Sequence, residues 1–136
     1  MRIGRSLAAP CVCFCLIAGP AAAAELTGAE IKDLVSGKTL YTETTAASST
    51  GTPGRAVTYY AVDGSALRKT PSGAMWHGTW TIKDNTICLN WKEAPGNPCS
   101  KYDKQGDGTN IINSASGKVR AKIVKTAAGN AENLAP

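Results

Sequence analysis

The residues best suited to chemistry are gathered in one stretch, HGTWTIKDNTICLNWKEAPGNPC, which runs from His77 to Cys99. It holds the only histidine of the chain, two of its three tryptophans, and the cysteines Cys88 and Cys99. A serine or cysteine hydrolase needs a histidine base that a carboxylate orients. His77 instead alternates with Thr79 and Thr81, and the chain has no G-x-S-x-G motif. We therefore expect a solvated strand histidine, no catalytic residues and no enzyme.

The first 24 residues have the layout of a secretory signal peptide. Two arginines precede an apolar run, and small residues then lead to an A-x-A pattern that ends at Ala24. The apolar run is shorter than the ~20 residues that a membrane-spanning helix needs. We therefore expect residues 1–24 to be removed, which leaves 25–136 as a single exported domain in the periplasm or outside the cell, with no membrane span.

Cleavage at that point changes both the cysteine count and the charge. Cys11, Cys13 and Cys15 leave with the signal peptide, and the loss of two arginines lowers the formal net charge from +5 to +3. Such a small charge gives no footprint for nucleic acid, which needs clustered cations. The two remaining cysteines, Cys88 and Cys99, are expected to form a disulfide in an oxidising compartment. Their spacing is neither C-x-x-C nor part of a four-ligand zinc set, so we expect no metal and no cofactor.

Local patterns predict one short helix followed by strands. Thr27 and Glu30 have the spacing of a helix-capping box, and the helix after them should present an apolar face made of Ile31, Leu34 and Val35. The segment 42–56 is rich in Thr, Ser, Gly and Ala and is expected to be a long exposed loop. From residue 57 onward, alternating segments are separated by four turn signals: Asp63-Gly64, Asp84-Asn85, Gly106-Asp107-Gly108 and Ser116-Gly117. We predict a mainly β fold, a small antiparallel β-barrel or sandwich with one short N-terminal helix and one disulfide.

The acidic and amide residues around the third turn have a spacing that suggests a calcium-binding loop. Asp103, Gln105 and Asp107 occupy the first ligand positions of an EF-hand loop, but Ser114 stands at the closing position and no helices flank the segment. A β-hairpin turn is therefore the favoured interpretation of this segment.

Three tryptophans are candidates for a ligand platform or for the core. Trp76, Trp80 and Trp91 all lie on the apolar face of their strands, where core packing is the commoner role.

A basic stripe follows the last strand. Lys118, Arg120 and Lys122 alternate there, with Val119, Ala121 and Ile123 on the other face, which we expect to point inward. A basic stripe can meet an acidic partner, but the usual explanation is the solvated outer face of an edge strand.

The stretch Tyr59–Leu134 resembles a family of small exported proteobacterial proteins described only as a domain of unknown function. The resemblance is carried by YYAVDGS, HGTWTIKDNTICLNW, an aromatic residue shortly after the second cysteine, and the closing pattern GN-x-EN-L. The DGS…GTW…I…L pattern is also similar to small lipocalin-like barrels, in which an apolar cup can hold a ligand. These resemblances imply a fold and a disulfide, but no activity and no catalytic residues.

The tetrapeptide SASG, Ser114 to Gly117, resembles a segment of the bacterial periplasmic inhibitors of c-type lysozyme. Such inhibitors place a loop in a cleft where two carboxylates carry out acid–base catalysis. This resemblance implies a contact surface on the turn Ser114–Arg120, with Ser116, Lys118 and Arg120 as contacts.

Two functions follow from these patterns. The leading hypothesis is a non-enzymatic ligand-binding or accessory module whose partner is a small apolar ligand. The alternative is a protein-directed inhibitor that acts through the Ser114–Arg120 turn.

Overall fold

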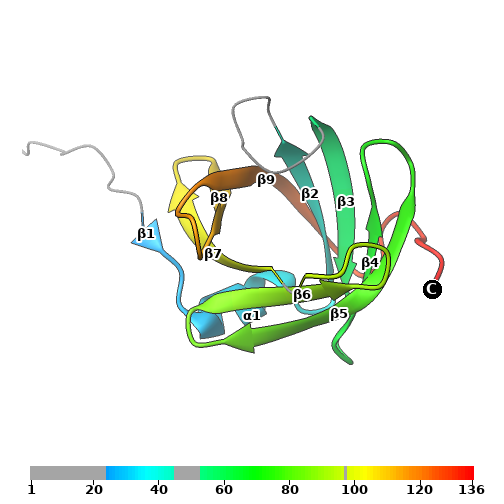
Figure 1. The fold of residues 1–136 in the computed structure, drawn as a ribbon, viewed down its shortest axis with the longest axis horizontal. Coiled ribbons are helices and arrows are strands. Elements are labelled where there is room, and N and C mark those ends of the chain that lie inside the picture. The colour runs from blue at the N-terminus through cyan, green and yellow to red at the C-terminus, as the bar shows by residue number, and fades with distance from the viewer. Residues whose placement is uncertain (1–23, 45–52, 97) are drawn as a thin grey trace, which may run out of the picture.

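The chain folds into a closed antiparallel β-barrel with one helix (Figure 1). The computed structural model describes residues 24–44, 53–96 and 98–136. Its elements are β1 (Ala24–Glu25), α1 (Gly28–Val35), β2 (Lys38–Thr44), β3 (Gly54–Tyr60), β4 (Ser65–Lys69), β5 (Met75–Lys83), β6 (Thr86–Trp91), β7 (Cys99–Gln105), β8 (Gly108–Asn113) and β9 (Val119–Ala128).

Closure of the barrel comes from a single long-range pairing. Strands β2 to β9 each pair with the next along the chain, and β9 then pairs with β2, while β1 pairs with β7 at Asp103 and Lys104, beyond the pairing of β7 with β6. The mainly β prediction is therefore confirmed, and of its two options the structure is a barrel of eight strands. The expected turns join β3 to β4, β5 to β6, β7 to β8 and β8 to β9.

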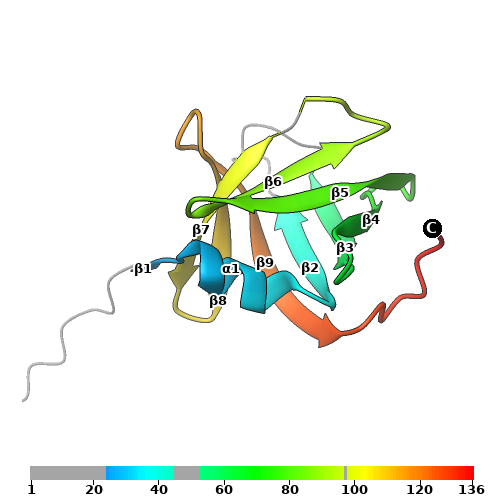
Figure 2. The ribbon, with the colours of Figure 1, turned by 90° about the horizontal axis from the view of Figure 1, so that it is seen from below.

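The helix α1 closes one end of this barrel (Figure 2). It begins with the predicted capping box: the Glu30 backbone N–H donates to the Thr27 hydroxyl, and the Glu30 carboxylate accepts from the Thr27 N–H at 2.7 Å. Ile31 and Val35 are fully buried and pack with Leu40 at the start of β2 and with residues of β5 and β6. The amphipathic face predicted from the sequence is thus what seals the barrel.

Aromatic packing fills the half of the barrel next to α1. The rings of Trp80 and Tyr60 meet edge to face with centroids 6.1 Å apart, and the Trp80 indole N–H donates to the Ala61 carbonyl at 2.9 Å. Beside them, β5 and β6 approach closely at Gly78, where a Cβ atom would lie 2.2 Å from the Asn90 carbonyl oxygen. This end of the barrel is a packed core.

The predicted disulfide is present between β6 and β7. Cys88 and Cys99 stand directly opposite each other in the antiparallel register, with Cα atoms 4.0 Å apart. Ile87 and Trp91, which are buried, face the barrel interior, so Cys88 lies on the outer face of β6, as the alternation along the strand predicts.

The prediction of an exposed loop at 42–56 is wrong at both ends of that segment. β2 continues to Thr44 and β3 begins at Gly54, and Thr42 and Ala56 are buried between them. Threonine suits a half-buried strand, so a polar composition did not prevent these residues from extending the hairpin. Residues 45–52 of the predicted loop, and residues 1–23 of the predicted signal peptide, lie outside the described residues. In the part of the chain that the structure describes, no helix is long and apolar enough to cross a membrane.

The C-terminal segment after β9 covers the outer face of β2. The Thr39 hydroxyl donates to the Gly129 carbonyl at 2.6 Å and accepts from the Ala131 N–H at 3.0 Å. Further along, the Tyr41 hydroxyl donates to Glu132, and Leu134 is buried. Both faces of β2 are therefore covered from Thr39 to Thr42, which accounts for the burial of these residues, whereas Glu43 is exposed.

Candidate functional site

The end of the barrel away from α1 holds a cavity of about 500 Å³. This volume falls in the range of about 300–1,000 Å³ that is typical of small-molecule sites. Its deepest walls are Tyr60, Ile87 and Tyr102, which are buried, and its rim is formed by the β4–β5 loop and the β6–β7 loop. The barrel interior is therefore filled at one end and hollow at the other.

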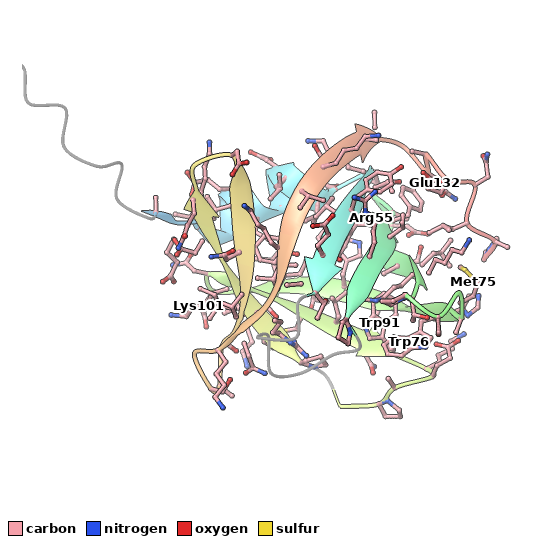
Figure 3. All side chains as sticks on the ribbon, turned by 90° about the horizontal axis from the view of Figure 1, so that it is seen from above. Arg55, Met75, Trp76, Trp91, Lys101 and Glu132 are labelled. Carbon is pink, nitrogen blue, oxygen red and sulfur yellow. A yellow bond between two sulfur atoms is a disulfide. The ribbon has the colours of Figure 1, made fainter. Side chains whose placement is uncertain are left out.

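One wall of the cavity is aromatic and apolar. The rings of Trp76 on β5 and Trp91 on β6 lie next to each other, with centroids 6.1 Å apart and planes inclined at 56° (Figure 3). Leu89 and Ala94 extend this wall along β6 and into the loop after it. The three predicted tryptophans therefore divide into two groups, since Trp76 and Trp91 line the cavity, whereas Trp80 belongs to the core.

Two arginines are the only charged side chains among the described residues that line this cavity. Arg68 extends from β4, and its guanidinium carbon lies 5.9 Å from the centroid of the Trp76 ring. Arg120 extends from the start of β9, and one of its nitrogens donates to the Ser100 hydroxyl at 3.2 Å. Both side chains are half-buried.

The position of Arg120 corrects the sequence interpretation of β9. The pairing of β8 with β9 shifts between Ile111 and Ile112, which face Ala121 and Val119, so Arg120 is an extra residue at a β-bulge. A bulge re-aims side chains and breaks the simple alternation. As a result Arg120 lines the cavity together with Ala121, while Val119, expected to point inward, is 42% exposed. The prediction that Arg120 lies on the solvated outer face is wrong.

Neither cavity arginine has a carboxylate partner. The ion pairs found among the described residues join Arg55 to Glu43, His77 to Glu93, Lys101 to Glu25 and Lys122 to Asp107. All ten acidic residues of the chain lie within the described ranges, so none is left to supply the missing charge. In addition, the Nε atom of Arg68 is buried and has no hydrogen-bond partner among the described residues.

Burial and mutual repulsion both disfavour the charges of this pair. Burial lowers the pKa of Arg68, and the pKa of Arg120 is lowered first by burial and then by the charge of Arg68. A guanidinium nevertheless stays protonated at neutral pH because it titrates far above that range. The lining of the cavity therefore carries two positive charges, near enough for the charge of Arg68 to lower the pKa of Arg120.

Two buried tyrosines, Tyr60 and Tyr102, also line the cavity. Burial raises the pKa of both Tyr60 and Tyr102, and the neighbouring Tyr60 raises the pKa of Tyr102 further. Both side chains are therefore neutral near pH 7. They contribute hydroxyl groups to the floor of the cavity and add no negative charge that would offset Arg68.

The lone histidine lies outside the cavity and has a partner that the sequence analysis missed. His77 Nδ1 lies 2.7 Å from one carboxylate oxygen of Glu93, and the His77 backbone N–H donates to the other oxygen at 2.8 Å. The pairing of β5 with β6 places residue 93 beside residue 77, a proximity that sixteen residues of separation do not reveal. No serine or cysteine of the described chain is hydrogen-bonded to this pair.

This pair predicts a specific dependence of stability on pH. The hydrogen bonds from the His77 ring and backbone hold the pKa of the Glu93 carboxyl below its ordinary value. A carboxyl whose pKa is depressed on folding stabilises the fold above its unfolded-state pKa, near 4.5, and this contribution is lost as the pH falls through the folded-state pKa. Glu93→Gln should therefore reduce stability at pH 7 and make the decline of stability below pH 5 shallower. Urea unfolding midpoints between pH 7 and pH 3 measure this, and an unchanged profile would contradict it.

The remaining predicted site residues occupy exposed turns. Ser116 and Lys118 lie in the turn between β8 and β9 and are exposed, so of the three predicted partner contacts only Arg120 faces the cavity. The segment that holds Asp103, Gln105 and Asp107 forms the β7–β8 hairpin, as favoured. Within the described ranges, no three His, Cys, Asp or Glu side chains are grouped so as to hold a metal ion.

Comparison with protein-family models, with curated proteins and with solved structures found no match for this chain.

Sequence reasoning missed three of the residues that shape this cavity. Arg68 lies in the segment SALRKT, where the apolar Leu67 next to it is the more obvious inward residue. Tyr60 and Tyr102 carried no motif of a known site. Their only available signal was alternation: Tyr60 shares a strand face with Thr58, and Tyr102 shares one with Ser100, and all four turn out to face inward.

Proposed function

We propose that this protein is an exported, non-enzymatic binding protein that holds a small molecule with an apolar or aromatic body in the open end of its barrel. The observation that carries the proposal is the division of the barrel interior into a packed end and a hollow end. The hollow end is lined by the paired rings of Trp76 and Trp91 and by Leu89. Apolar walls with a few polar groups are typical of small-molecule sites.

The inhibitor alternative has less support. It depends on a contact surface along the Ser114–Arg120 turn, and Arg120 is directed into the cavity instead of outward. The two contacts that remain exposed, Ser116 and Lys118, supply only one positive charge for an anionic target.

Binding of a neutral apolar dye tests the proposal. N-phenyl-1-naphthylamine, whose fluorescence rises in apolar surroundings, should bind the protein, quench its tryptophan fluorescence and raise its melting temperature. Trp76 and Trp91 are the rings expected to respond, because they line the cavity.

A variant pair on one strand shows whether the dye occupies the barrel. Ala121→Phe places a large ring inside the cavity, and Val119→Phe adds a ring on the outer face of the same strand. We expect the first to weaken dye binding about tenfold or more, since the volume is filled, and the second to leave it unchanged. No binding by the wild type, or equal binding by both variants, would overturn the proposal.

A further inference from the structure

The unexplained feature of the cavity is a pair of cations with no counter-charge. Arg68 and Arg120 are the only charged side chains among the described residues that line it, and neither forms an ion pair. A charge removed from water without a partner costs free energy, and two like charges close together add to that cost. Such an arrangement is expected where a bound group supplies the opposite charge.

The donors of this pair are largely unused by the described residues. The Arg68 Nε atom is buried without a partner, although buried donors are nearly always satisfied in native proteins. Arg120 has one hydrogen bond, to the Ser100 hydroxyl, and keeps its other guanidinium hydrogens for further acceptors. Arginine suits this role because its planar fork of N–H groups matches the two oxygens of a carboxylate.

Position also limits what the rest of the ligand can be. Arg68 packs against the Trp76 ring, which itself lies against Trp91, so the cationic pair and the aromatic wall are continuous. Tyr60 and Tyr102 also line the cavity, and their hydroxyl groups can donate hydrogen bonds to an anion. A ligand in this cavity therefore meets both cations and apolar surface.

We infer that the ligand is an amphipathic carboxylate whose head group lies between Arg68 and Arg120 and whose apolar or aromatic body lies against Trp76 and Trp91. The inference rests on the proposed function, because it names the class of molecule that the same cavity binds. A carboxylate supplies one negative charge and two acceptors, which serve the free donors of both guanidinium groups.

The first test compares acids with their own amides on the wild-type protein. Decanoate and 2-naphthoate, each beside its primary amide, are titrated against the complex with N-phenyl-1-naphthylamine at neutral pH and low salt. Acid and amide share one body and differ in charge, so the head group alone decides the difference. We expect each acid to displace the dye at about one-tenth or less of the concentration that its amide requires, because hydrogen bonds to a charged group are the stronger ones.

The second test removes each arginine. Arg68→Gln and Arg120→Gln leave a shorter polar side chain without charge, and each should reduce the advantage of acid over amide about tenfold. Arg55→Gln is the matched control, since Arg55 pairs with Glu43 on the outside of the barrel and does not line the cavity. Binding of the neutral dye by each variant shows that its cavity is intact.

The outcomes separate this inference from the proposed function. If the dye binds but acids and amides displace it equally, or if the advantage of the acids survives in both glutamine variants, the carboxylate is overturned and the apolar binding function stands. If neither dye nor acid binds the wild type, the proposed function itself fails. A loss of the advantage in Arg55→Gln equal to that in the cavity variants would also overturn the inference, since it would reflect general surface charge.

Discussion

Ile31→Ala is expected to lower the free energy of unfolding by about 2–5 kcal/mol, the usual cost of truncating a fully buried large aliphatic side chain. Ile31 has no exposed surface and lies where α1 closes the barrel against Leu40 and Ile87. Truncation leaves a void in the packed end, since the strands beneath are held by the closed sheet and cannot move in to fill it. Urea or thermal unfolding measures the change.

Lys32→Ala is the control for that measurement. Lys32 is the next residue of α1 but points to solvent, so the same change of helix sequence should alter stability by less than about 0.5 kcal/mol. A similar loss in both variants would mean that α1 contributes through its helical conformation and not through the buried face. An Ile31→Ala protein as stable as the wild type would show that the helix does not seal the barrel.

Removal of the disulfide is the second change with a large expected effect. Cys88→Ser together with Cys99→Ser should reduce stability by about 2–3 kcal/mol, because the bond closes a short loop and restricts the unfolded chain. For a domain of this size, that corresponds to a fall in melting temperature on the order of ten degrees. The β-barrel itself should persist, since the bond joins the outer faces of β6 and β7 and fills none of the core.

Thiol labelling provides the check on the bond itself. The native protein, isolated from an oxidising compartment and labelled under denaturing, non-reducing conditions, should show no free thiol from Cys88 or Cys99. Prior reduction should expose both thiols and reproduce the melting temperature of the double serine variant. Two labelled thiols without reduction would mean that the bond is absent and would reopen a metal or redox role for these cysteines.

Most of the secondary structure could be predicted because its determinants are local. The Thr27–Glu30 capping box and the residues Ile31 and Val35 that follow it define a short helix with one apolar face. Turn signals such as Asp63-Gly64 define the hairpins, since their backbone geometry depends on the turn residues themselves. The disulfide followed from one hairpin as well, because two cysteines on adjacent strands need only come opposite each other.

The extent of each strand was less predictable. Thr42 and Thr44 suit a strand, but they stand in a segment rich in Ser, Gly and Ala that indicated a loop, and Ala56 carries no strand signal. They extend β2 and β3 because the two strands pair with each other and with their neighbours. Pairing with a neighbouring strand can stabilise a residue in a strand because of its position, and composition alone does not indicate that position.

The sequence by itself determined that this protein would be a small, mainly β domain with an amphipathic helix and a Cys88–Cys99 bond, because each of these depends on residues that are near in the chain. Only the tertiary structure decided that the strands close into a barrel, since that depends on the pairing of β9 with β2, from opposite ends of the domain. It also decided that Arg68 and Arg120 point into one cavity. Arg120 does so because a bulge breaks the alternation of β9. Arg68 does so because the register of β4 between β3 and β5 places its side chain on the inner face of the barrel. A shift of one residue would have turned each side chain outward.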